Sequence, residues 1–337
     1  MRLLKTLFLS STLLMASSVT SFADVKVVAS IKPIHSLVAG VMEGVGEPDL
    51  IVDGQGSPHT FSMKPSQAQM LQSANIVFWV GHELEAFLEK PLETVGAKAI
   101  SVELFDAPNL IKLGFREGGT FEKHSHAGHE EDDHDDHKED DHADHKDDGH
   151  DDDKEHENHD DAHAGIDAHI WLDPMNAKAM VHVIKDALIA VDSDNASKYK
   201  ANAEVVLGKL DTLTNEVMAE LTPVKGKGYI VFHDAYQYFE KRFGVTASGS
   251  ITVSPEVMPG VERITTIRAR VQELGDTCLF AEPQFEPKLV GTVIEGTKAK
   301  SGVIDPLGSS LENGSDLYFN LIRNMASSIK ECLSRVS

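Results

Sequence analysis

Basic residues are scarce in this sequence. Its 337 residues include 31 Lys and Arg against 54 Asp and Glu, which gives a formal net charge of −23 at pH 7. A chain of this charge repels phosphates, so nucleic acid is disfavoured as a partner. The same acidity, combined with 17 His, indicates cations as partners instead. A hydrophobic content of 41% is still enough to bury real cores, which excludes wholesale disorder.

Cysteine is nearly absent, since only Cys278 and Cys332 occur. Two cysteines cannot form a Cys-rich zinc site. In an exported chain they indicate one disulfide, which would tie the last predicted helix to the C-terminal core. Two buried free thiols are the alternative.

Long apolar runs are missing after the N-terminus. No later segment reaches 18 apolar residues, so the sequence predicts no membrane-spanning helix in the mature chain. The N-terminus itself has Arg2 and Lys5, an apolar run at 7–15 and small residues that end at Ala23. This layout is typical of a secretory signal peptide, and we expect residues 1–23 to be removed. An uncleaved anchor is the alternative, but the run is short for it, and no cysteine near the cut would carry a lipid.

Apolar runs alternate with helical patterns in two parts of the chain. The first part has predicted strands and helices at 25–31, 33–42, 50–52, 66–74, 76–80, 83–89 and 99–102. The second part has them at 229–232, 235–243, 245–247, 261–274, 278–281, 288–298, 303–304 and 316–333. Such alternation predicts mostly parallel α/β sheets. Between the two parts we predict helices at 176–191 and 197–221, and the second is long enough to cross between lobes.

One segment is unlike the rest of the chain. Residues 121–163 contain 20 acidic residues, 4 Lys and 11 of the 17 His. Residues 118–164 lack apolar periodicity and cannot bury a core, so we predict a disordered, solvated loop there. We expect its histidines to collect zinc weakly and in several copies; a tract with no such role, or a general metal buffer, is the alternative. These histidines are His124, His126, His129, His134, His137, His142, His145, His150, His156, His159 and His163.

Three of the remaining histidines have informative local settings. His59 follows a predicted strand, His233 ends one, and His169 lies in the run Asp-Ala-His-Ile-Trp-Leu-Asp-Pro. Asp305 also follows a predicted strand, and ligands of open α/β sheets bind outside the carboxyl ends of strands. Three imidazoles and one carboxylate would suit a tetrahedral zinc site, whereas manganese favours oxygen-rich sites. Spacing alone is a weak signal, and a structural role for each histidine is the alternative.

Seven short stretches carry a resemblance to a known family. They are SIKP, GSPH, KPS, DAHIWLDP, FHDAY, FAEPQF and DPLG, at 30–33, 56–59, 64–66, 167–174, 232–236, 280–285 and 305–308. In this order they resemble the metal-binding (cluster A-I) solute-binding proteins of ABC importers, and within that family the zinc branch. The resemblance implies two similar α/β lobes joined by one long rigid helix, with the metal site in the cleft between the lobes. The corresponding ranges are 24–196, 197–222 and 223–337.

The resemblance also implies roles for individual residues. The resemblance implies that His59, His169 and His233 bind the metal. Manganese-type relatives have a carboxylate at the position of His233, so a histidine there favours Zn²⁺. Asp305 matches the acidic ligand of four-ligand members, and it would either coordinate the metal or lie behind the ligands. A bound water is another option for the fourth position, because Pro58 stands where some zinc members have Glu. Trp171 and Glu282 are expected beside the site, as its apolar wall and as a hydrogen-bond partner.

The implied function is capture of Zn²⁺ in the periplasm and its delivery to an inner-membrane ABC permease with a cytoplasmic ATPase. An accessory periplasmic zinc chaperone is a further candidate partner, and we expect a monomer without enzymatic activity. An exported zinc hydrolase is the alternative from another class, with three His and an open water position. Against it, the sequence has no His-Glu-x-x-His, no Gly-x-Ser-x-Gly and no phosphate-binding Gly loop. The sequence also leaves open a zinc buffer and a surface adhesin.

Overall fold

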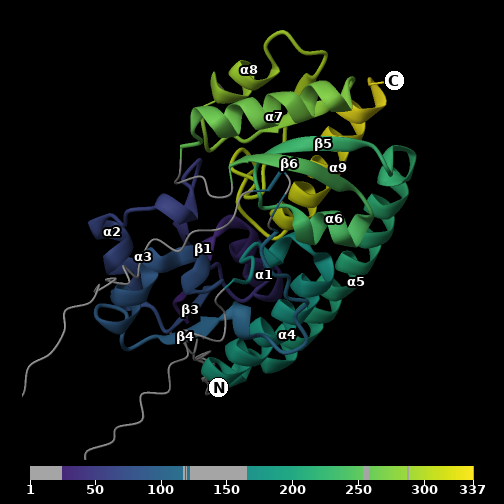
Figure 1. The fold of residues 1–337 in the computed structure, drawn as a ribbon. Coiled ribbons are helices and arrows are strands. Elements are labelled where there is room, and N and C mark those ends of the chain that lie inside the picture. Colours follow the sequence, from purple (N-terminus) through teal and green to yellow (C-terminus); the bar gives the residue numbers. More distant parts are fainter. Residues whose placement is uncertain are drawn as a thin grey trace, which may run out of the picture.

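Two four-stranded parallel sheets organise the chain (Figure 1). The computed structural model describes residues 25–116, 118, 120–121, 165–252, 258–286 and 288–336. The predicted signal peptide and the eleven histidines between 124 and 163 lie outside the described residues. Among the helices that the structure describes, none combines the length and the apolar character that a membrane crossing would need.

The first sheet has the strand order β2-β1-β3-β4. Its strands are β1 (Val27–Ile31), β2 (Asp49–Val52), β3 (Ile76–Trp79) and β4 (Ile100–Glu103). Every residue of β1 and β3 is buried, as expected for central parallel strands that helices cover on both faces. The helices that follow its strands are α1 (Lys32–Val41), α2 (Pro65–Ser73) and α3 (His82–Glu93).

The second sheet repeats this topology with the order β6-β5-β7-β8. Its strands are β5 (Gly228–His233), β6 (Thr246–Thr252), β7 (Cys278–Ala281) and β8 (Lys300–Val303). The accompanying helices are α6 (Gln237–Phe243), α7 (Val261–Leu274), α8 (Lys288–Ile294) and α9 (Leu317–Ser334). The prediction of two similar α/β lobes is therefore confirmed.

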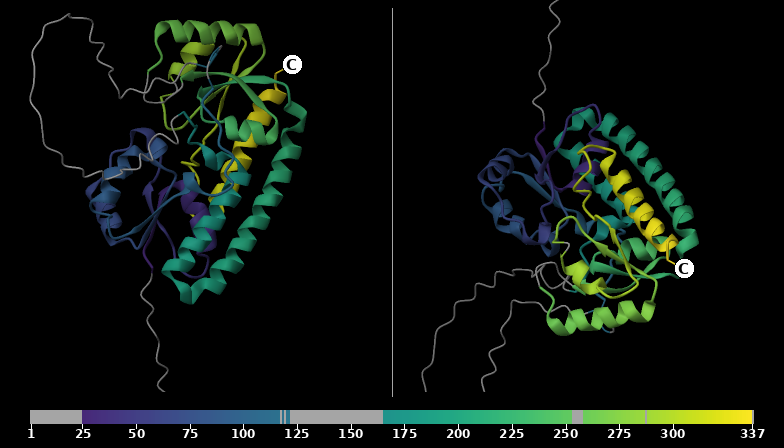
Figure 2. Two further views of the ribbon diagram at one scale, coloured as in Figure 1. Left: turned by 60° about the horizontal axis from the view of Figure 1, so that its bottom comes forward. Right: turned by 90° about the horizontal axis from the view of Figure 1, so that it is seen from above.

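Two helices lie between the sheets in sequence, α4 (Pro174–Val191) and α5 (Ala196–Leu221). The 26 residues of α5 span about 39 Å at 1.5 Å per residue. Its buried residues recur every three or four positions, so one stripe faces the protein along its whole length. It packs against α1 and α4 of the first lobe and against α9 of the second, and Figure 2 shows it running along both. The long connecting helix is thus confirmed.

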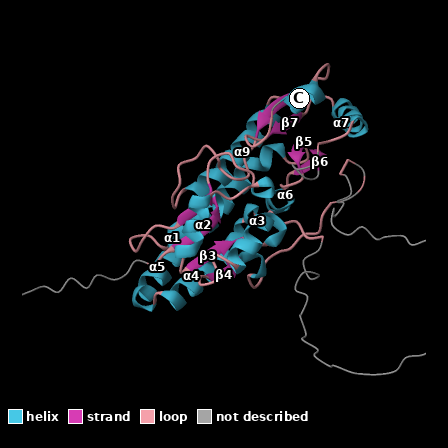
Figure 3. Ribbon diagram, turned by 90° about the vertical axis from the view of Figure 1, so that its left-hand side faces the viewer, coloured by secondary structure: helices cyan, strands magenta, loops and turns pink. Residues whose placement is uncertain are grey.

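The hydrophobic core is continuous between the lobes, although the sheets lie at opposite ends of the molecule (Figure 3). One cluster of buried side chains runs from the first sheet through α5 and α9 to one face of the second sheet. A smaller cluster lies between the other face of the second sheet and α7 and α8. Alternate side chains of β5 point to opposite faces of the second sheet. Tyr229 and Val231 therefore belong to the first cluster, and Ile230 and Phe232 belong to the second.

The C-terminal segment adds a second connection between the lobes. Tyr318, at the start of α9, is bonded to the first lobe. Its backbone N–H donates to Ser36 of α1 at 2.9 Å, and its hydroxyl donates to the carbonyl of Trp171 at 2.7 Å. The other end of α9 is tied to β7 by the predicted disulfide between Cys278 and Cys332, which is present. The lobes are therefore held by α9 as well as by α5.

Several element boundaries differ from the sequence prediction, most of all those of β6, α8, β8 and α3. Strand β6 continues to Thr252 where the prediction ended at 247, and α8 ends at Ile294 where the prediction continued to 298. Strand β8 covers Lys300–Val303 rather than 303–304, because it is an edge strand whose largely polar and exposed residues give no apolar signal. Helix α3 continues to Glu93 although it contains Pro91, where the prediction ended at 89.

Candidate metal centre between the lobes

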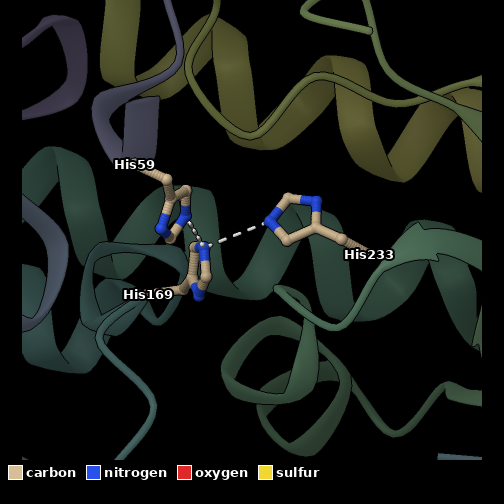
Figure 4. A group of neighbouring side chains, drawn as sticks. All are labelled: His59, His169 and His233. Atoms are coloured by element: carbon tan, nitrogen blue, oxygen red, sulfur yellow. Dashed lines mark hydrogen bonds between the residues drawn. The ribbon is translucent and has the colours of Figure 1, made fainter. Parts of the chain in front are cut away.

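Three imidazoles from both lobes converge on one point (Figure 4). The Nε2 atoms of His59 and His169 lie 3.3 Å apart, and so do those of His169 and His233. One ring nitrogen from each residue lies within 4.8 Å of the other two. A tetrahedral ion with Zn–N bonds of 2.0–2.1 Å would separate neighbouring nitrogens by about 3.3–3.4 Å. Both of these nitrogen–nitrogen distances therefore match one tetrahedral Zn²⁺ ion.

The elements that carry the three histidines belong to different parts of the fold. His59 lies in a short 3₁₀ turn, Pro58–Thr60, that follows β2 of the first lobe. His169 immediately precedes another such turn, Ile170–Leu172, that leads into α4. His233 is the last residue of β5 in the second lobe. The site thus lies outside the carboxyl ends of parallel strands, as expected for open α/β sheets.

Buried carboxylates orient two of the three rings. The Nδ1 atom of His169 lies 2.6 Å from Asp167 Oδ1, and that of His233 lies 2.7 Å from Glu282 Oε1. Both carboxylate side chains are 1% exposed. A carboxylate on Nδ1 holds the proton there, so that Nε2 presents its lone pair toward the centre of the group. Carboxylate–histidine pairs of this kind are characteristic of metal centres.

The electrostatic surroundings shift the pKa values of His59 and His233 in opposite directions. Burial lowers the pKa of His59 well below its usual value, and the neighbouring imidazoles of His169 and His233 lower it further. Burial also acts to lower the pKa of His233, but the charge of Glu282 and its hydrogen bond outweigh this and raise the pKa. His59 is therefore held neutral, which is the form that binds metal.

The segment from Asp167 to Asp173 is fixed mainly by α6 of the second lobe. Gln237 donates to Asp167 Oδ2 at 2.8 Å, and the hydroxyl of Tyr238 donates to the carbonyl of Asp167 at 2.7 Å. Arg242 donates to both carboxylate oxygens of Asp173, at 2.7 and 2.8 Å. Asp173 in turn caps α4 by accepting from the backbone N–H of Met175. The backbone that carries His169 is thus clamped from both ends.

A small cavity lies at the centre of the group. Its walls include the three histidines with Trp171, Glu282, Phe285 and Leu307. Its volume is about 10 Å³. Such a space holds about one water or one ion. The ring of Trp171 lies 5.3 Å from that of His169, so it does wall the site as the sequence suggested.

Asp305 lies outside the group of converging ligands in the described structure. Its carboxylate is instead occupied by five hydrogen bonds that shape the turn after β8. They come from the side chain of Gln284, the backbone N–H groups of 307, 308 and 309, and the hydroxyl of Ser309. A carboxylate has about four lone-pair positions, so these donors compete with a metal for all of them. The arrangement favours a supporting role for Asp305 over direct coordination.

Sequence reasoning missed the part played by Asp167. The signal was present, since a carboxylate two residues before a histidine can accept from both the backbone and the ring of that histidine. Asp167 Oδ1 does both, because the backbone N–H of His169 also donates to it at 3.0 Å. Of the other histidines, His35 lies apart from this site and contacts the carbonyl of Pro48 through Nε2, at 2.9 Å.

Comparison with known proteins places the chain in a family. It is 54% identical to the high-affinity zinc uptake system protein ZnuA of Brucella suis biovar 1, over 99% of this chain and all of that one. It is 36% identical to the protein of the same name from Yersinia pestis, over 98% of each chain.

Solved structures share the fold. A crystal structure of ZnuA superposes with a TM-score of 0.69 at 20% identity, over 91% of this chain and 99% of that one. The periplasmic zinc-binding protein TroA from Treponema pallidum gives a TM-score of 0.71 at 14% identity, over 93% of this chain and 100% of that one. The family model that describes the zinc-uptake complex component A, periplasmic, matches residues 27–332, and the chain therefore belongs to the ZnuA family.

Proposed function

We propose that this protein captures Zn²⁺ through His59, His169 and His233 as the binding component of an ABC-type zinc uptake system. The observation that carries the proposal is the convergence of three imidazoles from both lobes, in which His169 Nε2 lies 3.3 Å from the Nε2 atoms of His59 and His233. Three nitrogen ligands favour zinc over manganese, which prefers oxygen-rich sites. Membership in the ZnuA family supports the same ion.

The names of the relatives support a periplasmic location and a role in import. In this proposal residues 1–23 direct export, and the mature chain consists of lobes 24–196 and 223–337 linked by residues 197–222. The loaded protein would deliver Zn²⁺ to a membrane permease that a cytoplasmic ATPase powers. An accessory periplasmic chaperone and a monomeric state belong to the same proposal. The His-rich loop would collect zinc near the cleft as an accessory.

The size of the central cavity favours binding over catalysis. A space of about 10 Å³ accepts an ion, but an organic substrate would need a cleft of several hundred Å³. Glu282 already contacts the Nδ1 atom of His233, so this buried carboxylate serves to orient a ligand. A zinc hydrolase would instead need a carboxylate or imidazole free to activate the bound water.

The decisive experiment is a competitive zinc titration of a variant that lacks residues 122–164. The deletion keeps Arg116 and Thr120, whose side chains bind Asp234, Glu240 and the carbonyl of Ser248 in the second lobe. We expect one tight site per chain. It should be lost in His233→Ala and kept in His182→Ala, which changes an exposed histidine on α4.

Two outcomes would contradict the proposal. If the deletion variant has no tight site, the loop holds the metal and the protein is a zinc buffer. If the zinc-loaded protein hydrolyses ester substrates and His233→Ala abolishes this activity, the hydrolase alternative is correct.

A further inference from the structure

A second group of metal-ligating side chains lies on the first lobe, away from the three histidines. It consists of His82, Glu83 and Glu103, and one ligand atom from each lies within 4.8 Å of the other two. The Nε2 atom of His82 is 3.2 Å from Glu83 Oε1, and its Nδ1 atom is 3.6 Å from Glu103 Oε1. None of the three lines the cavity between the lobes. The two groups are therefore separate.

The position of this second group follows from the sheet topology. His82 and Glu83 begin α3 just after β3, and Glu103 is the last residue of β4. Strands β3 and β4 are parallel neighbours, so their carboxyl ends meet at the same edge. This is the edge of the sheet where open α/β folds bind ligands. The sheet order places the group on the β4 side, whereas His59 follows β2 at the opposite side.

Three carboxylate oxygens in this group are buried and accept no hydrogen bond of standard geometry, although ring nitrogens of His82 lie 3.2 and 3.6 Å from two of them. Both oxygens of Glu83 and Oε1 of Glu103 are shielded from solvent, and no donor of the described residues reaches them with hydrogen-bond geometry. A buried carboxylate oxygen without a hydrogen-bond donor destabilises the folded protein. Two carboxylates at this separation also repel each other. A divalent cation would satisfy the oxygens and remove the repulsion together.

The charge environment agrees with this description. The carboxylates of Asp106 and Glu83 place negative charge beside Glu103, and His82 is the neighbour that acts in the opposite direction. An excess of negative charge is thus concentrated at a partly buried position. The side chain of His82 remains 31% exposed, so an ion can enter from solvent.

We propose that His82, Glu83 and Glu103 form a second divalent-cation site, which takes Zn²⁺ with one nitrogen and two carboxylate ligands. Imidazole favours zinc over calcium and magnesium, and carboxylates complete a ligand set that zinc accepts. The open side toward solvent leaves room for a water ligand. The site is separate from the three-histidine centre.

The first test locates zinc directly. Crystals of the full mature chain are grown with excess Zn²⁺, and anomalous scattering is measured on both sides of the zinc absorption edge. We expect a peak between His82, Glu83 and Glu103 in addition to the one between the lobes. A map with a peak between the lobes and none at the second group would overturn the proposal.

The second test measures binding in solution with one tryptophan as a local probe. The chain has two Trp, and Trp79 is paired in register with Glu103, whereas Trp171 contacts His169. In a Trp171→Phe variant of the full mature chain, Co²⁺ replaces zinc and should quench the fluorescence of Trp79 with a saturable curve. A curve that does not saturate at submillimolar Co²⁺ would mean binding at crystal concentration only and would also refute the site.

Matched variants show which residues bind the Co²⁺ that quenches the fluorescence of Trp79. The double substitution Glu83→Gln and Glu103→Gln, added to Trp171→Phe, should abolish the saturable quenching. The control, Glu89→Gln with Glu93→Gln, removes the same charge from exposed positions of α3 and should leave the curve unchanged. Equal quenching in both double variants would refute the proposal. If the first variant does not fold, His82→Asn with the same probe makes the same distinction.

Discussion

The orienting carboxylates offer a sharp test of how the three-histidine centre holds zinc. Asp167 and Glu282 each place an oxygen 2.6–2.7 Å from the Nδ1 atom of a histidine whose Nε2 faces the cavity. Loss of such a partner typically lowers metal affinity by 10–100-fold. We therefore expect Asp167→Asn and Glu282→Gln both to weaken zinc binding. The structure further predicts which of the two substitutions has the larger effect.

Glu282→Gln should lie near the lower end of this range. A glutamine carbonyl oxygen can still accept from His233 Nδ1, and its amino group would take the place of Oε2, which accepts no hydrogen bond of standard geometry from the described residues. The tautomer of His233 is kept and only the negative charge is lost. We expect an affinity loss of about 10-fold, or about 1.4 kcal/mol.

The loss of zinc affinity in Asp167→Asn should lie near the upper end of the range of about 10–100-fold. Both oxygens of Asp167 accept hydrogen bonds, Oδ1 from the backbone and ring of His169 and Oδ2 from Gln237. The amino group of asparagine would face a donor in either orientation, so the loop that carries His169 must shift. We expect a loss of about 100-fold, or about 2.7 kcal/mol.

The assay is a competitive zinc titration of these variants with residues 122–164 removed. Asp211→Asn serves as the control, because it removes a negative charge from a side chain that is 59% exposed. Circular dichroism confirms that each variant is folded. If both substitutions change the affinity by less than about threefold, or if Glu282→Gln is the more damaging of the two, the reasoning from hydrogen-bond geometry is wrong.

Two further predictions concern stability. Replacing Cys278 and Cys332 by Ser removes a cross-link between residues 54 positions apart, and denaturant titration should show a loss of about 4 kcal/mol, whereas an unchanged midpoint would contradict it. Burial raises the pKa of Glu85 to about 7, against the hydrogen bonds that it accepts from Ser30 and the backbone N–H groups of 80 and 81. The folded state therefore keeps this proton more tightly than the unfolded state, so the stabilisation is complete below about pH 4.5 and is lost as the pH rises to 7. Glu85→Gln should consequently be more stable than the parent by roughly 3 kcal/mol at pH 8 and by little at pH 4, measured by denaturant titration without metal.

The alternation of apolar and helical patterns was sufficient to predict both sheets, because parallel strands buried on both faces are long apolar runs. Strand β1 is such a run, and its predicted end at Ile31 is the observed one. The edge strand β8 gave no comparable signal, since Lys300 and Ser301 are polar and exposed. Edge strands contribute little to the core, so their sequences are weakly constrained.

The candidate site was only partly predictable for a related reason. Histidines at the ends of strands stand out in a sequence, and His59, His169 and His233 do converge. Asp305 stands out in the same way, but its carboxylate is directed to the backbone of its own turn. Which atoms a carboxylate contacts depends on the local backbone conformation, and sequence spacing does not encode this for a single turn. Glu103 was missed because its partners, His82 and Glu83, come from α3, which follows the neighbouring strand β3.

The way the lobes are joined bears on how zinc is captured. The segment that carries His169 is bonded to both lobes, since Arg242 of α6 holds Asp173 and Trp171 donates to the carbonyl of Pro306 at 2.8 Å. A hinge between the lobes would have to break these bonds together with the packing of α9 on α1 and α5. Each buried bond lost costs about 1 kcal/mol or more, so wide opening is expensive.

Zinc should therefore bind to a site that is already formed, with little movement of the lobes. Spin labels at Glu89→Cys on α3 and Glu262→Cys on α7 would report the separation of the lobes from exposed positions. We expect addition of Zn²⁺ to change the label distance by less than about 2 Å, the usual limit for preorganised binding. A shift of many ångströms would mean that the bonds around Trp171 and Asp173 open in solution. In that case affinity would depend on the cost of closing the lobes, and Asp173→Asn would alter zinc binding without touching any ligand.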